Sequence, residues 1–285
     1  MSQKKLLALY GLKWNPFASD MPCEGIHLSQ SFENFAWRVE SLTLDGGFAL
    51  ITGDPGLGKS IAMRSLHEHL SRIRDIQVTA WTRPQSGLVD FYREIGHLFG
   101  IDLKTSNRWG GYRALREKWL NHISSTLLRP VILIDEAQEM PLPVLSELRL
   151  LASAQYDSQI LLTVVFSGDS RFTERLKTPE LLPLGTRLRT RLVLESQPKN
   201  ELTALLREVC CRAGAPQLMS DDLYTTIAEH SAGNIRIMMG LAKDVLALGC
   251  KKEHTPQLNA SLYFEAFPRV QSPGTRKPPR PTQTT

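Results

Sequence analysis

Apolar positions along the chain alternate between short continuous runs and longer stretches with helical spacing. Five runs have the length of strands, and the last could be short: residues 48–52, 76–81, 131–135, 160–166 and 192–195. The run VILID at 131–135 has no polar alternation, which is typical of a parallel strand covered on both faces. Because periodic stretches separate the runs, we expect an α/β fold with a five-stranded parallel sheet flanked by helices.

The periodic stretches predict where the helices lie. One carries Phe32 to Leu42 and ends before Gly46, and others cover about 59–70, 88–98, 112–123 and the region after Pro141. After residue 198 the strands stop, and three amphipathic helices follow: about 202–214, one capped by Ser220, and about 234–249. We therefore predict an N-terminal segment 1–29, an α/β domain 30–196, a small all-helical domain 197–265 and a tail 266–285.

Composition places the chain among ordinary globular proteins. Of its 285 residues, 42% are hydrophobic and 22% are charged, which excludes collagen-like and wholly disordered chains. No apolar run approaches the roughly 20 residues of a membrane-spanning helix, and no signal-peptide cleavage site follows the start, so we expect a cytoplasmic protein. The net charge is +5, of which +4 comes from the proline-rich tail. We expect that tail to be disordered, either as a solubilising end or as an arm that contacts phosphates or a partner protein.

The segment GDPGLGKS at 53–60 fits the pattern G-x-x-x-x-G-K-[ST], directly after a predicted strand and at the start of a predicted helix. Its glycines let backbone amides surround a phosphate chain, Lys59 can reach the β- and γ-phosphates, and the Ser60 hydroxyl can ligate Mg²⁺. The predicted nucleotide-binding residues are Gly53, Asp54, Pro55, Gly56, Leu57, Gly58, Lys59, Ser60 and Ile61.

A phosphate-binding loop of this kind requires an acidic residue at the end of a later buried strand, and VILIDE at 131–136 supplies two. Asp135 would contact Mg²⁺, usually through water, and Glu136 would orient and deprotonate the water that attacks the γ-phosphate. The pair could instead begin an ordinary surface turn.

With these motifs, residues 30–250 resemble the AAA+ ATPases. The resemblance implies a polar sensor in VVFSGD at 164–169, either Ser167 or Asp169. It also implies that an arginine of RLRTRL at 187–192 reaches the nucleotide of a neighbouring subunit, with Arg191 the first choice, Arg187 the second and Arg189 not excluded. Arg236 of GNIR would contact phosphate from the helical domain. Because the arginine of RLRTRL would come from the neighbouring subunit, ATP would be hydrolysed only between subunits.

Further segments narrow the resemblance to ExeA-type ATPases, whose members include a secretion ATPase and transposon-encoded helpers akin to TniB, TnsC, IstB and MuB. The segments are YGLKWNPF at 10–17, RPQSGLVDFYREIG at 83–96 and NRWGGYRALREKW at 107–119. Because the secretion member carries membrane and peptidoglycan-binding regions not found in these 285 residues, we favour the helpers. The resemblance implies ATP-dependent self-assembly on double-stranded DNA, recruitment or activation of a transposase, and disassembly on hydrolysis. The alternative is an ATPase of a secretion or envelope-assembly system that binds no DNA.

Basic residues between the second and third predicted strands are the candidates for contacting DNA. They are interleaved with Trp109 and Tyr112, and they comprise Lys104, Arg108, Arg113, Arg116 and Lys118. Contacts from these side chains to phosphates would bind DNA with little sequence preference. The same pattern also fits a helix with an apolar stripe and a solvated basic face.

Overall fold

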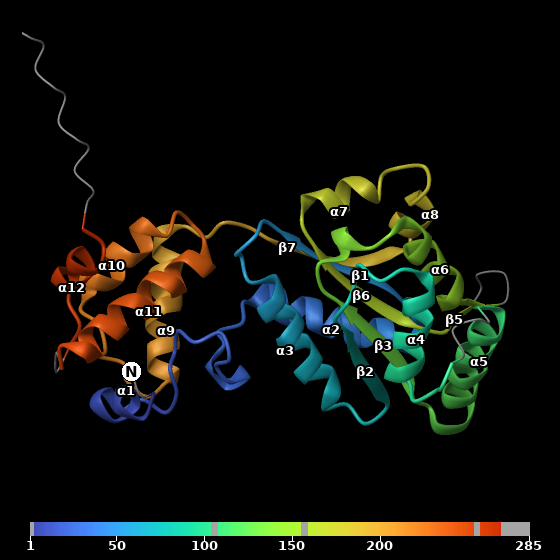
Figure 1. The fold of residues 1–285 in the computed structure, drawn as a ribbon, viewed down its shortest axis with the longest axis horizontal. Coiled ribbons are helices and arrows are strands. Elements are labelled where there is room, and N and C mark those ends of the chain that lie inside the picture. Colours follow the sequence, from blue (N-terminus) through green and yellow to red (C-terminus); the bar gives the residue numbers. More distant parts are fainter. Residues whose placement is uncertain (1–2, 104–107, 155–158, 254–256, 269–285) are drawn as a thin grey trace, which may run out of the picture.

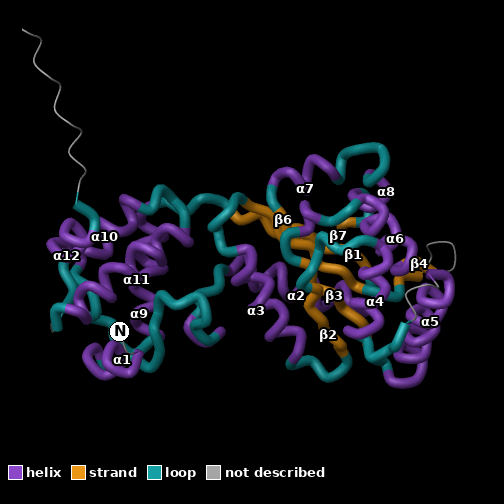
Figure 2. The backbone as a smooth tube through the Cα atoms, viewed as in Figure 1, coloured by secondary structure: helices purple, strands orange, loops and turns teal. Residues whose placement is uncertain are grey.

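The computed structural model describes residues 3–103, 108–154, 159–253 and 257–268, which form two lobes joined near the middle of the molecule (Figure 1). Every strand formed by these residues lies in one lobe, and the other lobe is helical (Figure 2). Lys104 and most of the predicted tail lie outside the described residues.

The α/β lobe is built on a parallel sheet with strand order β2-β3-β6-β1-β7. The strands are β1 (Gly47–Gly53), β2 (Ile76–Trp81), β3 (Arg129–Ile134), β6 (Thr163–Gly168) and β7 (Leu188–Leu194). The predicted fold class is confirmed. Since β6 pairs with both β1 and β3, the carboxyl ends of these three strands meet at one edge of the sheet, where a parallel α/β sheet presents its ligand site.

Helices cover both faces of the sheet. On one face α2 (Gln30–Asp45) and α3 (Lys59–Ser71) bury apolar side chains against alternate sheet residues such as Ile51 and Val165. The other face carries α4 (Leu88–Leu98), α5 (Arg108–Asn121), α6 (Leu142–Ala152), α7 (Ser170–Arg175) and α8 (Leu182–Gly185). Shorter turns are formed by Cys23–Gly25, His122–Thr126 and Ala137–Glu139. Both layers exclude water from the central strands β1, β3 and β6, which explains the unbroken apolar runs there.

The predicted strand 160–166 is partly wrong. Residues Gln159–Ile160 form β5, which pairs antiparallel with β4 (Ser153–Ala154), and the sheet strand begins only at Thr163. Leu161 and Leu162 between them are buried, but the Leu161 N–H donates to the Ala152 carbonyl rather than to the sheet. An apolar run records burial and not the direction of the backbone hydrogen bonds.

The predicted fifth strand, 192–195, begins four residues too late. Strand β7 already starts at Leu188. Its first residues are not a continuous apolar run, because exposed Arg189 and Arg191 alternate with buried Thr190 and Leu192. This alternation is typical of an edge strand with one covered face. A search for continuous apolar residues misses it.

The helical lobe contains α9 (Lys199–Arg212), α10 (Asp221–His230), α11 (Ile235–Lys251) and α12 (Ala260–Ala266). The Ser220 side chain caps α10 by accepting a backbone N–H group, as the sequence predicts, and the Asn234 side chain caps α11 in the same way. Helix α1 (Gln3–Tyr10) packs on the same lobe through Leu6, so the chain starts there before it crosses to the sheet. The domain limits stay a prediction. No helix within the described ranges is long and apolar enough to cross a membrane.

Candidate functional site

The loop between β1 and α3 lies at the carboxyl edge of the sheet. Gly56 and Gly58 have φ of +89° and +99°, a left-handed conformation that glycine adopts without steric cost. Lys59, only 7% exposed, starts α3 and donates from Nζ to the carbonyls of Gly53 (2.8 Å) and Asp54 (3.1 Å). The ammonium group therefore lies inside the loop and beside the amino end of a helix, an arrangement that favours an anion.

The acidic pair follows β3 directly. Glu136 has φ of 53° and ψ of 43°, a left-handed conformation that is uncommon for a residue with a side chain. Its N–H donates to Asp135 Oδ1 at 2.9 Å, and Gln138 Nε2 donates to Glu136 Oε2. The turn therefore fixes the backbone of Glu136 and one of its carboxylate oxygens.

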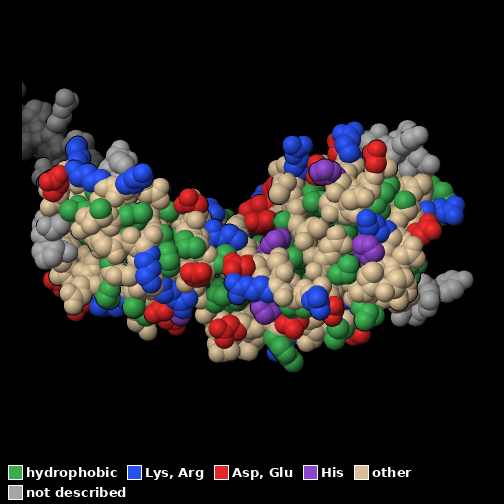
Figure 3. Space-filling view, turned by 90° about the horizontal axis from the view of Figure 1, so that it is seen from below, with side chains coloured by type: hydrophobic (Ala, Val, Ile, Leu, Met, Phe, Trp, Pro, Cys, Tyr) green, Lys and Arg blue, Asp and Glu red, His purple; other side chains and the backbone are tan. Residues whose placement is uncertain are grey.

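A cleft of about 610 Å³ brings the loop, Glu136 and the helical lobe together. Cationic side chains outnumber acidic ones in its lining: Lys59, Arg64, Arg171, Arg236 and Lys243 against Glu136 and Asp169. Ser60 and Ile61 also line the cleft, whereas Asp135 borders an adjoining cavity that also includes Glu136. Figure 3 shows the surface dipping between the two lobes, with charged side chains along the junction. The excess of positive charge suits a polyanionic ligand.

The two predicted sensor residues occupy different environments. Ser167 is fully buried in β6 opposite Ile51, and its Oγ has no hydrogen-bond partner within the described part of the chain. Asp169 borders the cleft, caps α7 and forms an ion pair with Arg171 at 2.8 Å. Burial alone would raise the pKa of Asp169, but the hydrogen bonds and charge of Arg171 hold it below its usual value. Asp169 is therefore a charged group at the cleft.

None of the three candidate arginines on and before β7 lines the cleft of its own chain. Arg187 donates to Ser153 Oγ at 2.8 Å, and Arg189 lies 3.6 Å from Asp45. Arg191 is exposed, and in the described ranges it makes no hydrogen bond or ion pair. Its strand partner is Leu50, so both side chains project from the same face of the sheet. Arg191 is the one of the three whose guanidinium is free to reach a neighbouring molecule.

Arg236 approaches the cleft from α11, and two contacts hold the start of this helix on the loop. The Arg236 N–H donates to the Gly56 carbonyl at 3.0 Å, and Asn234 Nδ2 donates to the Pro55 carbonyl at 2.9 Å. The motif GNIR marked Arg236 but not the role of Asn234. That role depends on a contact between residues far apart in the sequence.

A second cavity of about 540 Å³ adjoins the cleft, and the sequence did not predict it. The two share the lining residues Met21, Gly58, Ile61, Ile235 and Met239. Much of its wall comes from residues 21–32, which arginines of both lobes hold in place. Arg64 donates to the Met21 carbonyl at 2.8 Å, and Arg212 donates to the Ile26 carbonyl at 2.9 Å. The only sequence signal was the apolar Ile26 and Leu28 before the first predicted helix.

The candidate DNA residues on α5 have unequal surroundings. Arg108 forms an ion pair with the buried Glu147, which also accepts from the Tyr92 hydroxyl. Arg116 donates to backbone carbonyls at the carboxyl end of α6, including that of Leu150. These two arginines hold α5 on its neighbours.

The remaining described basic side chains of α5, Arg113 and Lys118, differ in their exposure. Arg113 is exposed and, among the described residues, has no ion pair or hydrogen bond, while Lys118 is half-buried. Trp109 is 68% exposed and stacks on the ring of Tyr112, with ring centroids 5.5 Å apart. Arg113 is thus the clearest candidate on this helix for an external contact.

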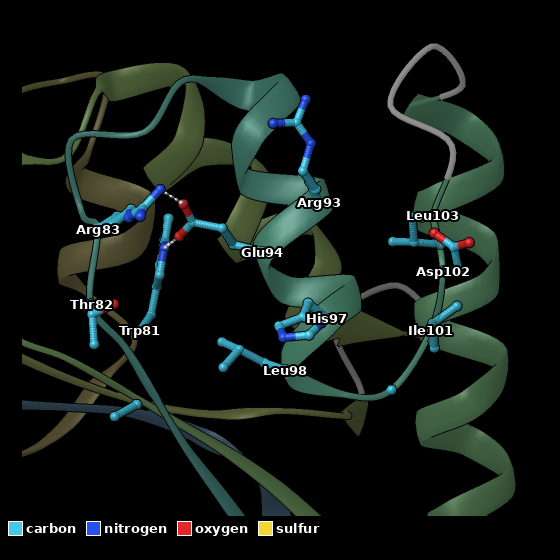
Figure 4. A pocket seen from close by; sticks show the side chains of 12 residues that line it. Trp81, Thr82, Arg83, Arg93, Glu94, His97, Leu98, Ile101, Asp102 and Leu103 are labelled. Atoms are coloured by element: carbon cyan, nitrogen blue, oxygen red, sulfur yellow. Dashed lines mark hydrogen bonds and ion pairs between the residues drawn. The ribbon is translucent and has the colours of Figure 1, made fainter.

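Figure 4 shows a cavity of about 720 Å³ between the end of β2, α4 and residues 100–103. Glu94 accepts from Trp81 Nε1 at 2.5 Å and lies 4.0 Å from Arg83. No residue of the loop 53–60 borders it. The segment 83–96 therefore builds the wall of a cavity separate from the phosphate loop.

Comparisons with known proteins agree with this architecture. A family model described as an AAA domain matches residues 43–176. The chain is 28% identical over 234 residues to general secretion pathway protein A of Aeromonas hydrophila, spanning 80% of this chain and 42% of that protein. The chain thus covers less than half of this distant relative.

Solved structures show the same fold. The Aeropyrum pernix ORC2 protein in its ADP form has a TM-score of 0.68 at 13% identity, covering 88% of this chain and 71% of that one. Drosophila ORC bound to DNA has a TM-score of 0.62 at 16% identity, covering 93% of this chain and 65% of that one. The chain has the AAA+ fold, and its residues 43–176 are similar to the AAA domain.

Proposed function

We propose that this protein is a Mg²⁺-dependent ATPase that hydrolyses ATP in the cleft between its two lobes. The observation that carries the proposal is the meeting of Lys59, Ser60, Glu136 and Arg236 around one cationic cleft. These residues come from separate segments of the chain and from both lobes. Their types match the needs of phosphoryl transfer, which depends mainly on positioning and on stabilisation of charge.

The nucleotide occupies both the cleft and the neighbouring cavity. The phosphates lie against the amino end of α3 and Lys59, and the base enters the more apolar cavity lined by Ile26, Leu205 and Met239. Met21 and Gly58 border both spaces, so one ligand can occupy both.

The residues present fit Mg²⁺, because the Ser60 hydroxyl and the Asp135 carboxylate offer the hard oxygen donors that this ion prefers. Bound there, the ion would neutralise charge on the phosphates. Asp135 lies beside the cleft rather than in its lining, which suits a contact through water.

Glu136 supplies the base. Its carboxylate takes a proton from a water molecule as the water oxygen bonds to the γ-phosphorus, and the bond from that phosphorus to the bridging oxygen of ADP breaks. The hydrogen bond from Gln138 orients the carboxylate. Asp169 and Arg236, which also line the cleft, are placed to respond to the products.

Arg191 acts from a neighbouring copy, so turnover requires self-assembly. Its exposed side chain, which has no partner among the described residues of its own chain, supports this assignment over Arg187 and Arg189. A guanidinium supplied from outside stabilises the charge that develops on the γ-phosphate.

Two candidate roles for the ATPase differ in the partner that it acts on. The relationship to general secretion pathway protein A favours an ATPase of a secretion or envelope-assembly system, and it is the stronger support. The second role is a DNA-dependent regulator that passes target DNA to a transposase. The exposed Arg113 and the stacked Trp109 on α5 favour that role.

Duplex DNA separates the two roles. In the regulator role, ATP-bound protein binds duplex DNA with little sequence preference, turnover rises on binding, and Arg113→Ala flattens the slope of log affinity against log salt by about one unit. Deleting residues 269–285 tests whether the basic tail provides the attraction instead. No binding at low salt in the presence of ATP would eliminate the regulator and leave the secretion-type role.

A further inference from the structure

The first turn of α11 is bonded directly to the phosphate loop. Two consecutive carbonyls of that loop accept hydrogen bonds from the helical lobe: Pro55 accepts from the side-chain amide of Asn234 at 2.9 Å, and Gly56 accepts from the N–H of Arg236 at 3.0 Å. The first of these bonds joins positions 179 residues apart. The helical lobe therefore touches the peptide units expected to surround phosphate.

The carbonyl and the N–H of each of these two peptide units point to opposite sides of the loop. In a trans peptide the C=O and the N–H point to opposite sides, so a carbonyl directed at α11 leaves the N–H of the next residue directed away from the lobe. A phosphate that accepts the Gly56 N–H, or the Leu57 N–H in place of its long bond to the Asp54 carbonyl (3.4 Å), polarises the same peptide unit and strengthens its carbonyl as an acceptor. Phosphate binding and lobe contact thus reinforce each other.

Space at this contact admits no side chain on the loop. A Cβ at Gly56 would lie 2.4 Å from Asn234 Oδ1, and the φ of +89° at Gly56 also disfavours other residues. Glycine here serves the approach of α11 as well as the turn of the loop.

Asn234 also uses both ends of its amide. Its Oδ1 accepts the Ile237 N–H at 3.2 Å and so caps α11, while its Nδ2 holds Pro55. Serine or aspartate caps a helix equally well, but neither carries an amide donor at that reach. The cap alone does not require asparagine, whereas the contact with Pro55 does.

We propose that Asn234 is a positioning residue. Its hydrogen bond to Pro55 holds the helical lobe against the phosphate loop and so positions Arg236 over the γ-phosphate of ATP. This inference rests on the proposed ATPase function. The backbone of Arg236 is held by Gly56, so its guanidinium projects from a fixed point beside the loop. ATP, which offers that guanidinium a γ-phosphate that ADP lacks, gains more from this contact than ADP does.

The matched substitutions are Asn234→Ser and Asn259→Ser. Asn259 caps α12 through the same type of bond, to the Leu262 N–H, and does not border the cleft. Serine keeps both caps but is too short to replace the amide donor. Asn234→Ser should lower the ratio of ATP to ADP affinity by about fivefold, which corresponds to one net hydrogen bond, and should lower kcat with it. Asn259→Ser should leave the ratio and kcat unchanged.

Hydrogen exchange in the wild-type chain gives a second measurement that needs no variant. The amide of Arg236 should exchange more slowly with Mg²⁺–ATP than with Mg²⁺–ADP, because only ATP has the γ-phosphate that holds the Arg236 guanidinium, and with it the start of α11, at the loop. Equal protection by the two nucleotides would overturn the inference, as would an Asn234→Ser protein that keeps the wild-type affinity ratio and kcat. A wild-type chain that binds no ATP would instead overturn the ATPase proposal itself.

Discussion

The phosphate loop and α5 were both singled out by their sequence, and they use their basic residues in opposite ways. Lys59 is buried within the loop, and the cleft around it gathers residues from both lobes. On α5, Arg108 is paired with Glu147 and Arg116 holds carbonyls of α6, which leaves Arg113 exposed. A motif with fixed spacing specifies backbone geometry, whereas a cluster of charges does not say whether each charge faces inward or outward.

The largest effect should come from the arginine expected to act between subunits. Arg191→Ala should lower ATP turnover by about 10³-fold, because the charge on the γ-phosphate loses its stabilising partner. Turnover of the wild type should rise steeply with protein concentration. Arg189→Ala, on the same strand, is the control and should retain activity.

Mixing sharpens this test. Arg191→Ala protein combined with Glu136→Gln protein should recover activity, because some interfaces then pair an intact arginine with an intact base. Absence of recovery at every ratio would argue against an arginine supplied by the neighbour.

A smaller loss of turnover is expected at the acidic turn that follows β3. Glu136→Gln should retain ATP binding but slow hydrolysis by about 10²- to 10³-fold, since the amide cannot accept a proton. Assemblies formed with ATP should therefore last longer, which sedimentation can follow. Wild-type turnover in Glu136→Gln would remove Glu136 from the role of base.

The matched control for that variant is Glu139→Gln, in the adjoining turn Ala137–Glu139. Glu139 is exposed, lies 3.3 Å from Arg171 and is absent from the lining of the cleft. Its substitution should leave hydrolysis within about twofold of the wild type, because exposed ion pairs contribute little and this carboxylate does not face the nucleotide.

On α5 the comparison concerns stability. Arg108→Ala leaves the Glu147 carboxylate buried without its cation and should lower the free energy of unfolding by about 1–3 kcal/mol. Arg113→Ala removes an exposed side chain and should change the free energy of unfolding by less than about 0.5 kcal/mol. Urea denaturation measures both. Equal stability of the two variants would mean that Arg108 is as free for an outside partner as Arg113.

The smallest effect is a pH dependence of stability, which arises from Tyr92 and its contact with Glu147. Burial, together with the Glu147 carboxylate, raises the pKa of the Tyr92 hydroxyl. A group with a raised pKa contributes stability below its unfolded value, near pH 10, and loses it as the pH rises toward the folded value. The free energy of unfolding should therefore fall above about pH 10, and fall less in Tyr92→Phe. Parallel pH profiles would contradict this role of Tyr92.

The sequence predicted the parts of the molecule that depend on local spacing. The strand, loop and helix around Gly53 to Ser60 follow from one motif, and the cap Ser220 follows from residue type. Contacts between distant segments were not predictable in this way. The bond from Asn234 to Pro55, the pairing of Arg108 with Glu147 and the cavity wall formed by residues 21–32 all arise from tertiary packing.

Titration with Mg²⁺–ATP tests the central claim most directly. The wild type should bind ATP, and Lys59→Ala should weaken binding by at least about 100-fold, because Lys59 is the buried cation inside the loop. Lys251→Ala, an exposed lysine at the end of α11, should bind as the wild type does. Equal ATP affinity in Lys59→Ala and the wild type would contradict the assignment of the cleft as the ATP site.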